Sequence, residues 1–284
     1  MSAEQTAQPV QSPQPPQPPP VPPAARSGGA GFATALRVFS ARSLKKSFRD
    51  GESLMMAILL PVFLMLIFNF VMGGAIDVGG GGRQAYLAYV MPAVVLTAAG
   101  FGASYTAVVV SQDVTTGFMN RLRTMPFPAV TVLLGHAVSS MVRNLMATAV
   151  VVLVGFAVGF RTEADAGQLL GSLGLILLWI LAITVIFALL GLVAGSPESA
   201  NGYGFVLLFL PYVSSGFAPV QTMPGWLQGF AQHQPMTPVI DASRALMNGQ
   251  DAGADPWIAV AWCLGFMAVA VWIMSVVFPR KVAR

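Results

Sequence analysis

The basic segment at residues 117–135 holds the arrangement of side chains that most strongly suggests a specific role. It reads GFMNRLRTMPFPAVTVLLG and carries Arg121 and Arg123 but no acidic residue. Guanidinium groups can pair with carboxylates of another protein or with phosphates of lipid headgroups. Pro126 and Pro128 end the segment, because proline cannot continue a helix without losing a backbone hydrogen bond. An ordinary basic loop of a membrane protein explains the arginines, but it does not explain a short helix bounded by prolines.

Catalytic and cofactor-binding patterns are missing from the rest of the sequence. The stretch GGGGRQ at residues 79–84 lacks the lysine and the hydroxyl of a P-loop, so the chain cannot hydrolyse a nucleotide by that route. His136 and His233 stand far apart in the sequence and are interpreted as interfacial and outer-surface side chains. Clustered aspartates for a membrane enzyme and nucleic-acid-binding motifs are also absent. We therefore expect no enzymatic activity, and no metal or cofactor bound by this chain.

The composition places most of the chain in a membrane. Hydrophobic residues make up 55% of it and charged residues 9%, whereas about 25% of a soluble domain is charged. Six of the intervals between charged residues, at 53–76, 84–112, 144–160, 166–197, 199–240 and 256–279, hold between 17 and 42 uncharged residues each, and a helix that crosses the hydrocarbon needs roughly 17–25 apolar residues. The sequence therefore predicts an all-α membrane protein with six transmembrane helices, near residues 53–76, 86–110, 129–160, 169–194, 203–220 and 257–278.

Apart from Arg143, these six runs contain no Asp, Glu, Lys or Arg, and none of these residues is placed clearly at mid-membrane depth. Ion-coupled carriers normally need such groups, so a stand-alone secondary carrier is disfavoured and the energy for transport should come from another subunit. Arg143 lies early in the third run and is expected to reach the membrane interface with its long side chain. The single cysteine, Cys263, is interpreted as an apolar filler of the last run, with no intrachain disulfide partner.

The fifth predicted span is irregular. Pro211 lies in its middle and Gly216 follows soon after, which predicts a short, interrupted helix. The next stretch is too polar to span a membrane and too apolar for a free loop. We expect one short helix around residues 226–230 and another over 239–246, starting after Pro238. Both are placed as re-entrant or interfacial helices on the outer side, since broken backbone is tolerated in a membrane only against protein or water.

The distribution of Lys and Arg predicts the orientation. With six spans, twelve of the 15 basic residues fall on one side of the membrane and three, Arg83, Arg161 and Arg244, on the other. This asymmetry places both termini in the cytoplasm. Residues 1–31 are expected to be a disordered, Pro/Gln-rich cytoplasmic tail. Residues 51–284 form the predicted membrane domain.

Residues 32–50 predict an amphipathic helix that lies on the cytoplasmic leaflet. Its expected apolar positions are Phe32, Leu36 and Phe39, and its expected headgroup-facing positions are Arg42, Lys45, Lys46 and Arg49. The two stripes belong to successive halves of the helix, so the amphipathicity is moderate.

Two motifs in this sequence resemble those of ABC type-2 exporter permeases, especially the membrane subunits of the daunorubicin-resistance type. The first is Gly-Phe-x-x-Arg-x-Arg-x-x-Pro followed by Leu-x-Gly, carried by Gly117, Phe118, Arg121, Arg123, Pro126, Leu133 and Gly135. The second lies in QPMTPVIDASRALMNG and is carried by Gln234, Pro235, Arg244, Leu246 and Gly249. The PESA at residues 197–200 also fits, and the resemblance covers about residues 32–280.

The resemblance implies a bacterial cell-membrane exporter powered by separate subunits. Two permease chains, identical or paired with a sister chain, would form the pathway above two ABC ATP-binding subunits, which hold the ATP and Mg. The segment near 113–126 would couple to the ATPase through Asp113, Gly117, Phe118, Arg121, Arg123, Pro126 and Glu198. Gln234, Pro235, Arg244 and Gly249 would belong to the outer re-entrant segment.

The class of substrate implied is a hydrophobic drug, an antibiotic or a lipid. The alternative within the family is a polysaccharide or a lipid-linked glycan, which an aromatic-lined path would favour. The resemblance places the path between the two permeases, along the first, second and fifth spans. An apolar wall there could include Met55, Met56, Phe63, Met65, Phe68 and Phe70, although no residue is assigned to a substrate site.

Overall fold

The computed structural model describes residues 32–282 except 77, 79 and 118–129, and within those residues it contains helices and turns but no strand. The predicted tail at residues 1–31 lies outside the described residues. The elements are α1 Phe32–Arg49, α2 Gly51–Ile67 continued by the π-helical turn Phe68–Met72, α3 Gly82–Thr115, α5 Val130–Val158, α6 Ala166–Val193, α7 Pro197–Phe209 continued by the 3₁₀ turn Leu210–Val213, the 3₁₀ turn Val220–Thr222, α8 Gly225–His233, α9 Met236–Met247 and α10 Asp255–Val282.

Five helices in the described residues are long and apolar enough to cross a membrane: 54–72, 82–115, 131–158, 166–193 and 255–278. The all-helical membrane architecture is therefore confirmed. The expected span at 203–220 is not among the five. It overlaps only the second half of α7, a helix of 13 residues that is only about 20 Å long, less than the ~30 Å hydrocarbon core. Regular helix ends next to Pro211, whose ring removes a backbone donor.

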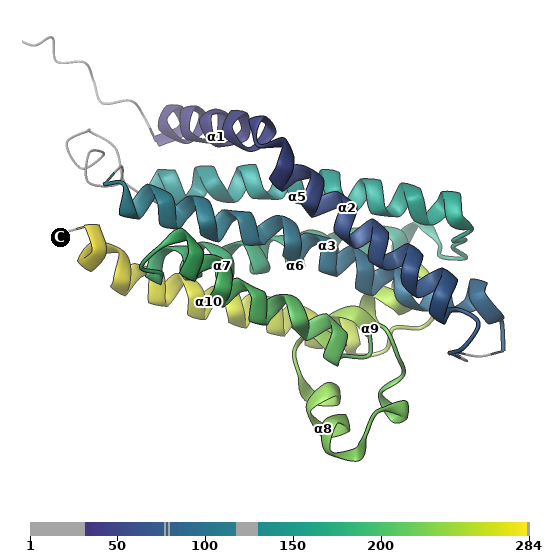
Figure 1. Ribbon diagram of the computed structural model, residues 1–284. Helices are drawn as coiled ribbons and strands as arrows, with labels where there is room; N and C mark the ends of the chain where they lie inside the picture. Colours follow the sequence, from purple (N-terminus) through teal and green to yellow (C-terminus); the bar gives the residue numbers. More distant parts are fainter. Residues whose placement is uncertain (1–31, 77, 79, 118–129, 283–284) are drawn as a thin grey trace, which may run out of the picture.

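α3 is the central helix of the bundle. It has 34 residues, about 51 Å of helix, and packs against α2, α5, α6, α7 and α9 (Figure 1). Glycines allow the close approaches. A side chain at Gly191 of α6 would overlap the backbone of Ala107, and one at Gly102 would overlap the amide of Asn144 on α5.

The connections divide between two ends of the bundle (Figure 1). At one end lie α1, the end of α3, the start of α5 and the C-terminal end of α10; we call this the α1 end. The α2–α3 and α5–α6 connections lie at the opposite end. This alternation is what antiparallel spans produce.

α1 packs along α5 by a narrow stripe of small side chains and one ring. The buried positions are Ala35, Phe39, Ser43 and Ser47, at i, i+4, i+8 and i+12. Gly135 of α5 makes the approach possible, because an added Cβ would lie 2.9 Å from the Cβ of Phe39. Of the apolar positions expected to face the lipid, Phe32 is 50% exposed, whereas Phe39 is buried against α5.

Candidate functional site

Asp113 and His136 join the two ends of the gap that contains the basic segment. Asp113 lies in the last turn of α3 and His136 in the second turn of α5. Their Oδ2 and Nε2 atoms are 2.8 Å apart, and both side chains are buried. A hydrogen bond between an ionised carboxylate and an imidazole is stronger than a neutral one. The base of segment 118–129 is therefore closed by a buried polar contact.

α1 is attached to the same pair. The Ser43 hydroxyl lies 3.3 Å from Nδ1 of His136, so both ring nitrogens of that histidine have a partner. Arg42 Nη1 lies 3.9 Å from Oδ2 of Asp113. Lys46 donates to the side-chain carbonyl of Gln112 at 3.3 Å. α1 is thus held by polar contacts to α3 as well as to α5.

Arg143 extends this polar contact into the bundle. Its guanidinium donates to the carbonyl of Gly102 at 2.6 and 3.0 Å, to Ser47 at 2.7 Å and to Thr106 at 3.1 Å. It also lies 4.8 Å from the ring centroid of Tyr105. Only 4% of the residue is exposed, so the expectation that it reaches the interface was wrong. It is turned inward because Gly102 leaves its carbonyl uncovered.

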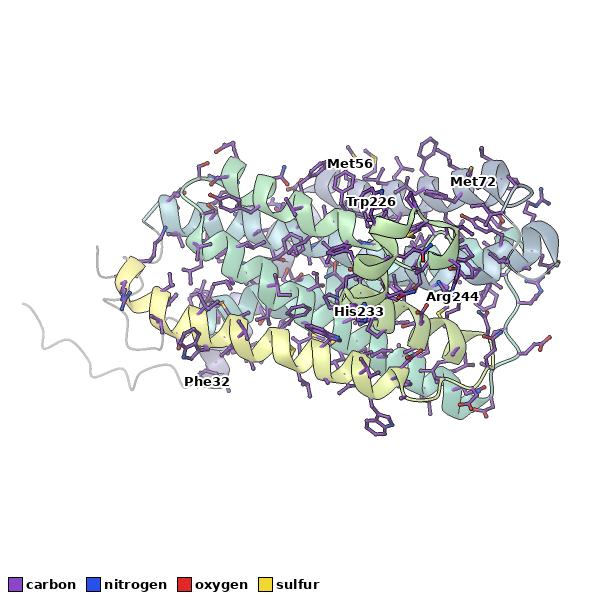
Figure 2. All side chains as sticks on the ribbon, turned by 90° about the horizontal axis from the view of Figure 1, so that it is seen from below. Phe32, Met56, Met72, Trp226, His233 and Arg244 are labelled. Atoms are coloured by element: carbon purple, nitrogen blue, oxygen red, sulfur yellow. The ribbon has the colours of Figure 1, made fainter. Side chains whose placement is uncertain are left out.

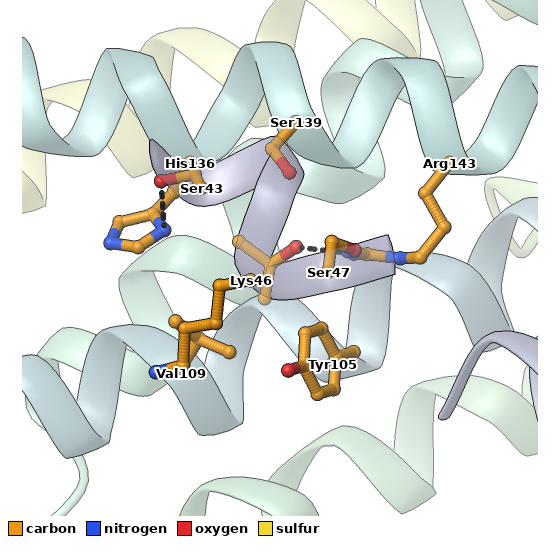
Figure 3. Close-up of a pocket in the computed structure, with 9 residues that line it drawn as sticks. Ser43, Lys46, Ser47, Tyr105, Val109, His136, Ser139 and Arg143 are labelled. Atoms are coloured by element: carbon orange, nitrogen blue, oxygen red, sulfur yellow. Dashed lines mark hydrogen bonds between the residues drawn. The ribbon is translucent and has the colours of Figure 1, made fainter. Parts of the chain in front are cut away.

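A small polar pocket lies between α1, α3 and α5 (Figure 3). Its volume is about 10 Å³, enough for a single water molecule. Ser43 and Lys46 from α1, Tyr105 from α3 and Arg143 from α5 line it. The hydrogen bonds from Ser43 to His136 and from Arg143 to Ser47 cross between helices here (Figure 3).

The structure describes only part of the expected coupling surface. Phe118, Arg121, Arg123 and Pro126 lie outside the described residues. Gly117 takes φ +69°, a left-handed conformation that suits glycine, and turns the chain directly after α3. Asp113 is buried rather than displayed.

Glu198 is exposed in the first turn of α7. The helix begins with a reciprocal capping box between Ser196 and Ser199. Hydrogen bonds from Ser196 and from the backbone lower the pKa of the Glu198 carboxyl, so it is anionic at neutral pH. A negative charge also suits the start of a helix. Of the expected coupling residues in the described part of the chain, this one is open to a partner.

A groove of about 1080 Å³ opens between α1, α2, α3 and α7. Charged side chains, including Arg49, Asp50 and Glu198, line one part of it. Met56 and Phe205 are among the apolar residues that line the rest. Met56 and Met72 lie along the same edge of the molecule (Figure 2). In the expected apolar wall, Met55, Met56, Phe63 and Phe70 are exposed, Phe68 is half-buried and Met65 is fully buried.

The second motif forms a separate cluster around Arg244 of α9 (Figure 2). The guanidinium donates to the carbonyl of Tyr89 at 3.0 Å and to that of Ser215 at 2.6 Å, and pairs with Asp241. It lies 3.8 Å from the ring centroid of Tyr89. The Ser215 hydroxyl donates to Asp241 at 2.6 Å. Arg244 therefore ties α9 to the start of α3 and to the irregular chain after α7.

Gln234 makes a similar link. Its amide donates to the carbonyl of Leu210 at 3.2 Å and to that of Val213 at 3.4 Å, where α7 gives way to a 3₁₀ turn. Pro235 is the N-cap of α9. The helix begins at Met236, so the predicted start after Pro238 was wrong. Proline is accepted in a first turn because the backbone donors there have no partner within the helix.

Gly249 lies where two connections touch. It has φ +74°, and an added Cβ would lie 2.8 Å from the carbonyl of Glu163. Gly249→Ala should lower the free energy of unfolding by about 1–3 kcal/mol, from backbone strain plus the clash. Gly253→Ala is the matched control, since Gly253 has φ +51° with nothing within 4 Å. Equal thermal midpoints in detergent for the two variants would contradict the close contact.

Sequence reasoning missed the residues that hold α1 in place. His136 was interpreted as an interfacial side chain, and the serines of α1 were given no role. A signal was present: His136, Ser140 and Arg143 recur at helical spacing inside an apolar span, as do Ser43 and Ser47 in α1. Polar side chains repeated on one face of a membrane helix indicate contact with another helix.

Comparison with known proteins agrees with the resemblance. Residues 34–248 match the ABC-2 type transporter family. The daunorubicin resistance ABC transporter permease protein DrrB1 of Streptomyces coeruleorubidus is 30% identical over 213 residues, which cover 75% of this chain and 74% of that protein. The probable doxorubicin resistance ABC transporter permease protein DrrC of Mycobacterium tuberculosis is 24% identical over 257 residues, covering 88% of this chain and 92% of that protein. The resemblance inferred from the two motifs is confirmed, and the chain belongs to the ABC-2 type transporter family.

Proposed function

We propose that this chain is the membrane-spanning permease of an ATP-driven exporter that moves a hydrophobic drug, an antibiotic or a lipid out of the cell. The observation that carries the proposal is the family match together with relatives named for daunorubicin and doxorubicin resistance. The five apolar helices supply a multi-pass membrane domain. Energy is supplied by an ABC ATP-binding subunit, with which members of this family associate.

The complete exporter contains two ATP-binding subunits, which hold ATP and Mg, and a second permease chain. The α1 end faces the cytoplasm, together with both termini. α1 lies at the inner membrane surface, where Arg37, Lys45 and Arg49 can contact anionic headgroups. α7 and the turn after it complete a sixth, short crossing. α8 and α9 are re-entrant on the outer side, and the exposed Trp226 of α8 suits a membrane interface.

The groove between α2 and α7 forms one wall of the substrate path. It opens on the side of the molecule where α7 exposes Phe205, Val206 and Phe209. A second permease chain covers these side chains in the assembled exporter. The apolar and charged parts of the groove together suit an amphipathic molecule. The apolar part buries apolar surface of the substrate, and the charged part pairs with its polar groups.

Drug accumulation tests the proposed function. Cells that express the chain with its ATP-binding subunit should retain several-fold less daunorubicin than cells that express either protein alone. Replacing the P-loop lysine of the ATP-binding subunit by alanine should abolish this difference. Efflux that continues with the disabled ATPase would identify a stand-alone carrier and overturn the proposal.

Reversal of the two coupling arginines provides a local test. Arg121→Glu with Arg123→Glu should reduce both efflux and co-purification of the ATP-binding subunit about tenfold, as expected when charge-assisted contacts are replaced by repulsion. Arg161→Glu reverses one charge at the opposite end of the bundle, as each of the two substitutions does at its own position, and should leave both efflux and co-purification unchanged. Normal association of the double variant would remove the arginines from the docking surface.

A further inference from the structure

The segment expected to grip the ATPase is attached to the bundle at two points, the end of α3 and the start of α5. If the two helix ends moved independently, a displacement of the segment would change the distance between them and would not move the rest of the bundle. The buried contact between Asp113 and His136 opposes such a change, since Nε2 and Oδ2 are 2.8 Å apart. Breaking it would leave the buried carboxylate with only the longer contact to Arg42, at 3.9 Å, which is costly.

α1 is bound to the same two helices through four of its residues. Arg42 contacts Asp113, Ser43 contacts His136, Lys46 contacts Gln112 and Ser47 contacts Arg143. These four positions of α1 cover more than one helical turn, so they resist rotation of α1 about its own axis as well as its separation. Contacts to α3 alternate with contacts to α5 along the helix.

The deep end of this contact is anchored in α3. Arg143 of α5 holds the carbonyl of Gly102 with two donors and the hydroxyl of Thr106 with one. The contact thus runs along α3 from Asp113 to Gly102, eleven positions and about 16 Å of helix. A single contact between Asp113 and His136 would let α3 and α5 rotate about it. A second contact about 16 Å away, between Gly102 and Arg143, prevents this rotation.

We propose that α1, the last turns of α3 and the first turns of α5 form a single rigid unit, the base unit, with His136 as the positioning residue that unites all three. The base unit carries movement of segment 118–129 into the membrane domain, so α1 moves with the segment rather than lying passively on the lipid. This proposal rests on the proposed coupling function of the segment. It adds that transport per ATP hydrolysed depends on the buried contacts of His136.

The first measurement compares transport with hydrolysis. The full chain and its ATP-binding subunit are placed in proteoliposomes, and daunorubicin uptake and phosphate release are measured together. His136→Ala should lower daunorubicin moved per ATP about tenfold, the effect of losing a buried charge-assisted hydrogen bond, while the ATPase subunit still co-purifies. Ser139→Ala, one turn away in the wall of the same pocket, is the matched control and should change the ratio less than twofold. The exchanged pair Asp113→His with His136→Asp should restore the ratio.

The second measurement reports rigidity directly. Spin labels are attached to Val38→Cys on α1 and Thr116→Cys after α3, both exposed positions, in a Cys263→Ala chain. The distance distribution between them should be narrow and should not shift when ATP and vanadate are added. His136→Ala should broaden it even without nucleotide. If the His136→Ala chain does not reach the membrane, both measurements are made on Ser43→Ala and on Asp113→Asn, with the same expected changes.

The outcomes separate the two proposals. If the wild-type chain and its ATP-binding subunit show no ATP-dependent daunorubicin uptake, the proposed function is refuted. The spin-label distances measured without nucleotide still test the base unit in that case. A wild-type distance that shifts on ATP binding shows that α1 moves separately, which overturns the inference. The same conclusion follows if His136→Ala keeps both the narrow distribution and the normal transport per ATP.

Discussion

Arg244→Ala is expected to abolish drug efflux and to lower the free energy of unfolding by about 3–5 kcal/mol, because it removes two charge-assisted hydrogen bonds to carbonyls, each worth roughly 1.5–3 kcal/mol, and one partner of a partly buried ion pair. The substitution leaves Asp241 without its cation and removes the donors to the carbonyls of Tyr89 and Ser215. These contacts join α9, the start of α3 and the irregular chain after α7. Arg244→Lys should recover only a small part of the loss, because a point charge cannot serve three acceptors in different directions.

The efflux assay and the thermal midpoint in detergent test this prediction. Arg161→Ala is the control, since Arg161 is exposed and donates to carbonyls close to it in the sequence, that of Phe160 at 2.8 Å and that of Phe156 in the last turn of α5 at 3.1 Å. Both variants lose one positive charge. If Arg244→Ala keeps the wild-type midpoint and efflux, the cluster has no structural role and the second motif needs another explanation.

Gly191→Val should prevent accumulation of folded protein in the membrane. An added Cβ at this position of α6 would overlap the carbonyl oxygen of Ala107 and lie 2.9 Å from its Cα and 3.0 Å from its carbonyl carbon. Helix backbone cannot move aside as a side-chain tip can, so α3 and α6 would have to separate. Over-packing of this kind costs about 1–3 kcal/mol or more, and α3 is the helix around which the others pack.

The abundance of folded protein by fluorescence-detected gel filtration checks this prediction. Gly174→Val on the same helix is the control, because a Cβ added at Gly174 would have nothing within 4 Å and the residue is exposed. Equal monodisperse peaks for the two variants would mean that α3 and α6 do not approach each other closely at Gly191.

The sequence predicted the membrane helices well where a long uncharged interval coincides with one regular helix. α6 and α10 are of this kind. Lipid alone requires an apolar segment of this length to be helical, so the prediction does not depend on which helices are neighbours. The interval at 203–220 is also uncharged, but Pro211 ends the regular helix early. Length without charge therefore indicates burial in a membrane, and it does not establish an uninterrupted crossing.

The candidate site was less predictable, because its geometry depends on which helices are neighbours. Arg143 was expected at the interface, and the inward alternative requires Gly102 to lie opposite it with an uncovered carbonyl. Asp113 was expected at a partner surface. Its actual partner, His136, is 23 positions away on another helix, so the pairing depends on how α3 and α5 pack. Pairings between distant helices are not contained in the pattern of either helix alone.

The length of α3 has a mechanical consequence. A stiff rod of about 51 Å that pivots by only about 5° moves one tip relative to the other by roughly 4 Å. One end carries Asp113, and Arg244 contacts Tyr89, about two turns from the other end. An angular change too small to unpack the middle of the bundle is therefore amplified into a displacement of molecular size on the far side of the bilayer.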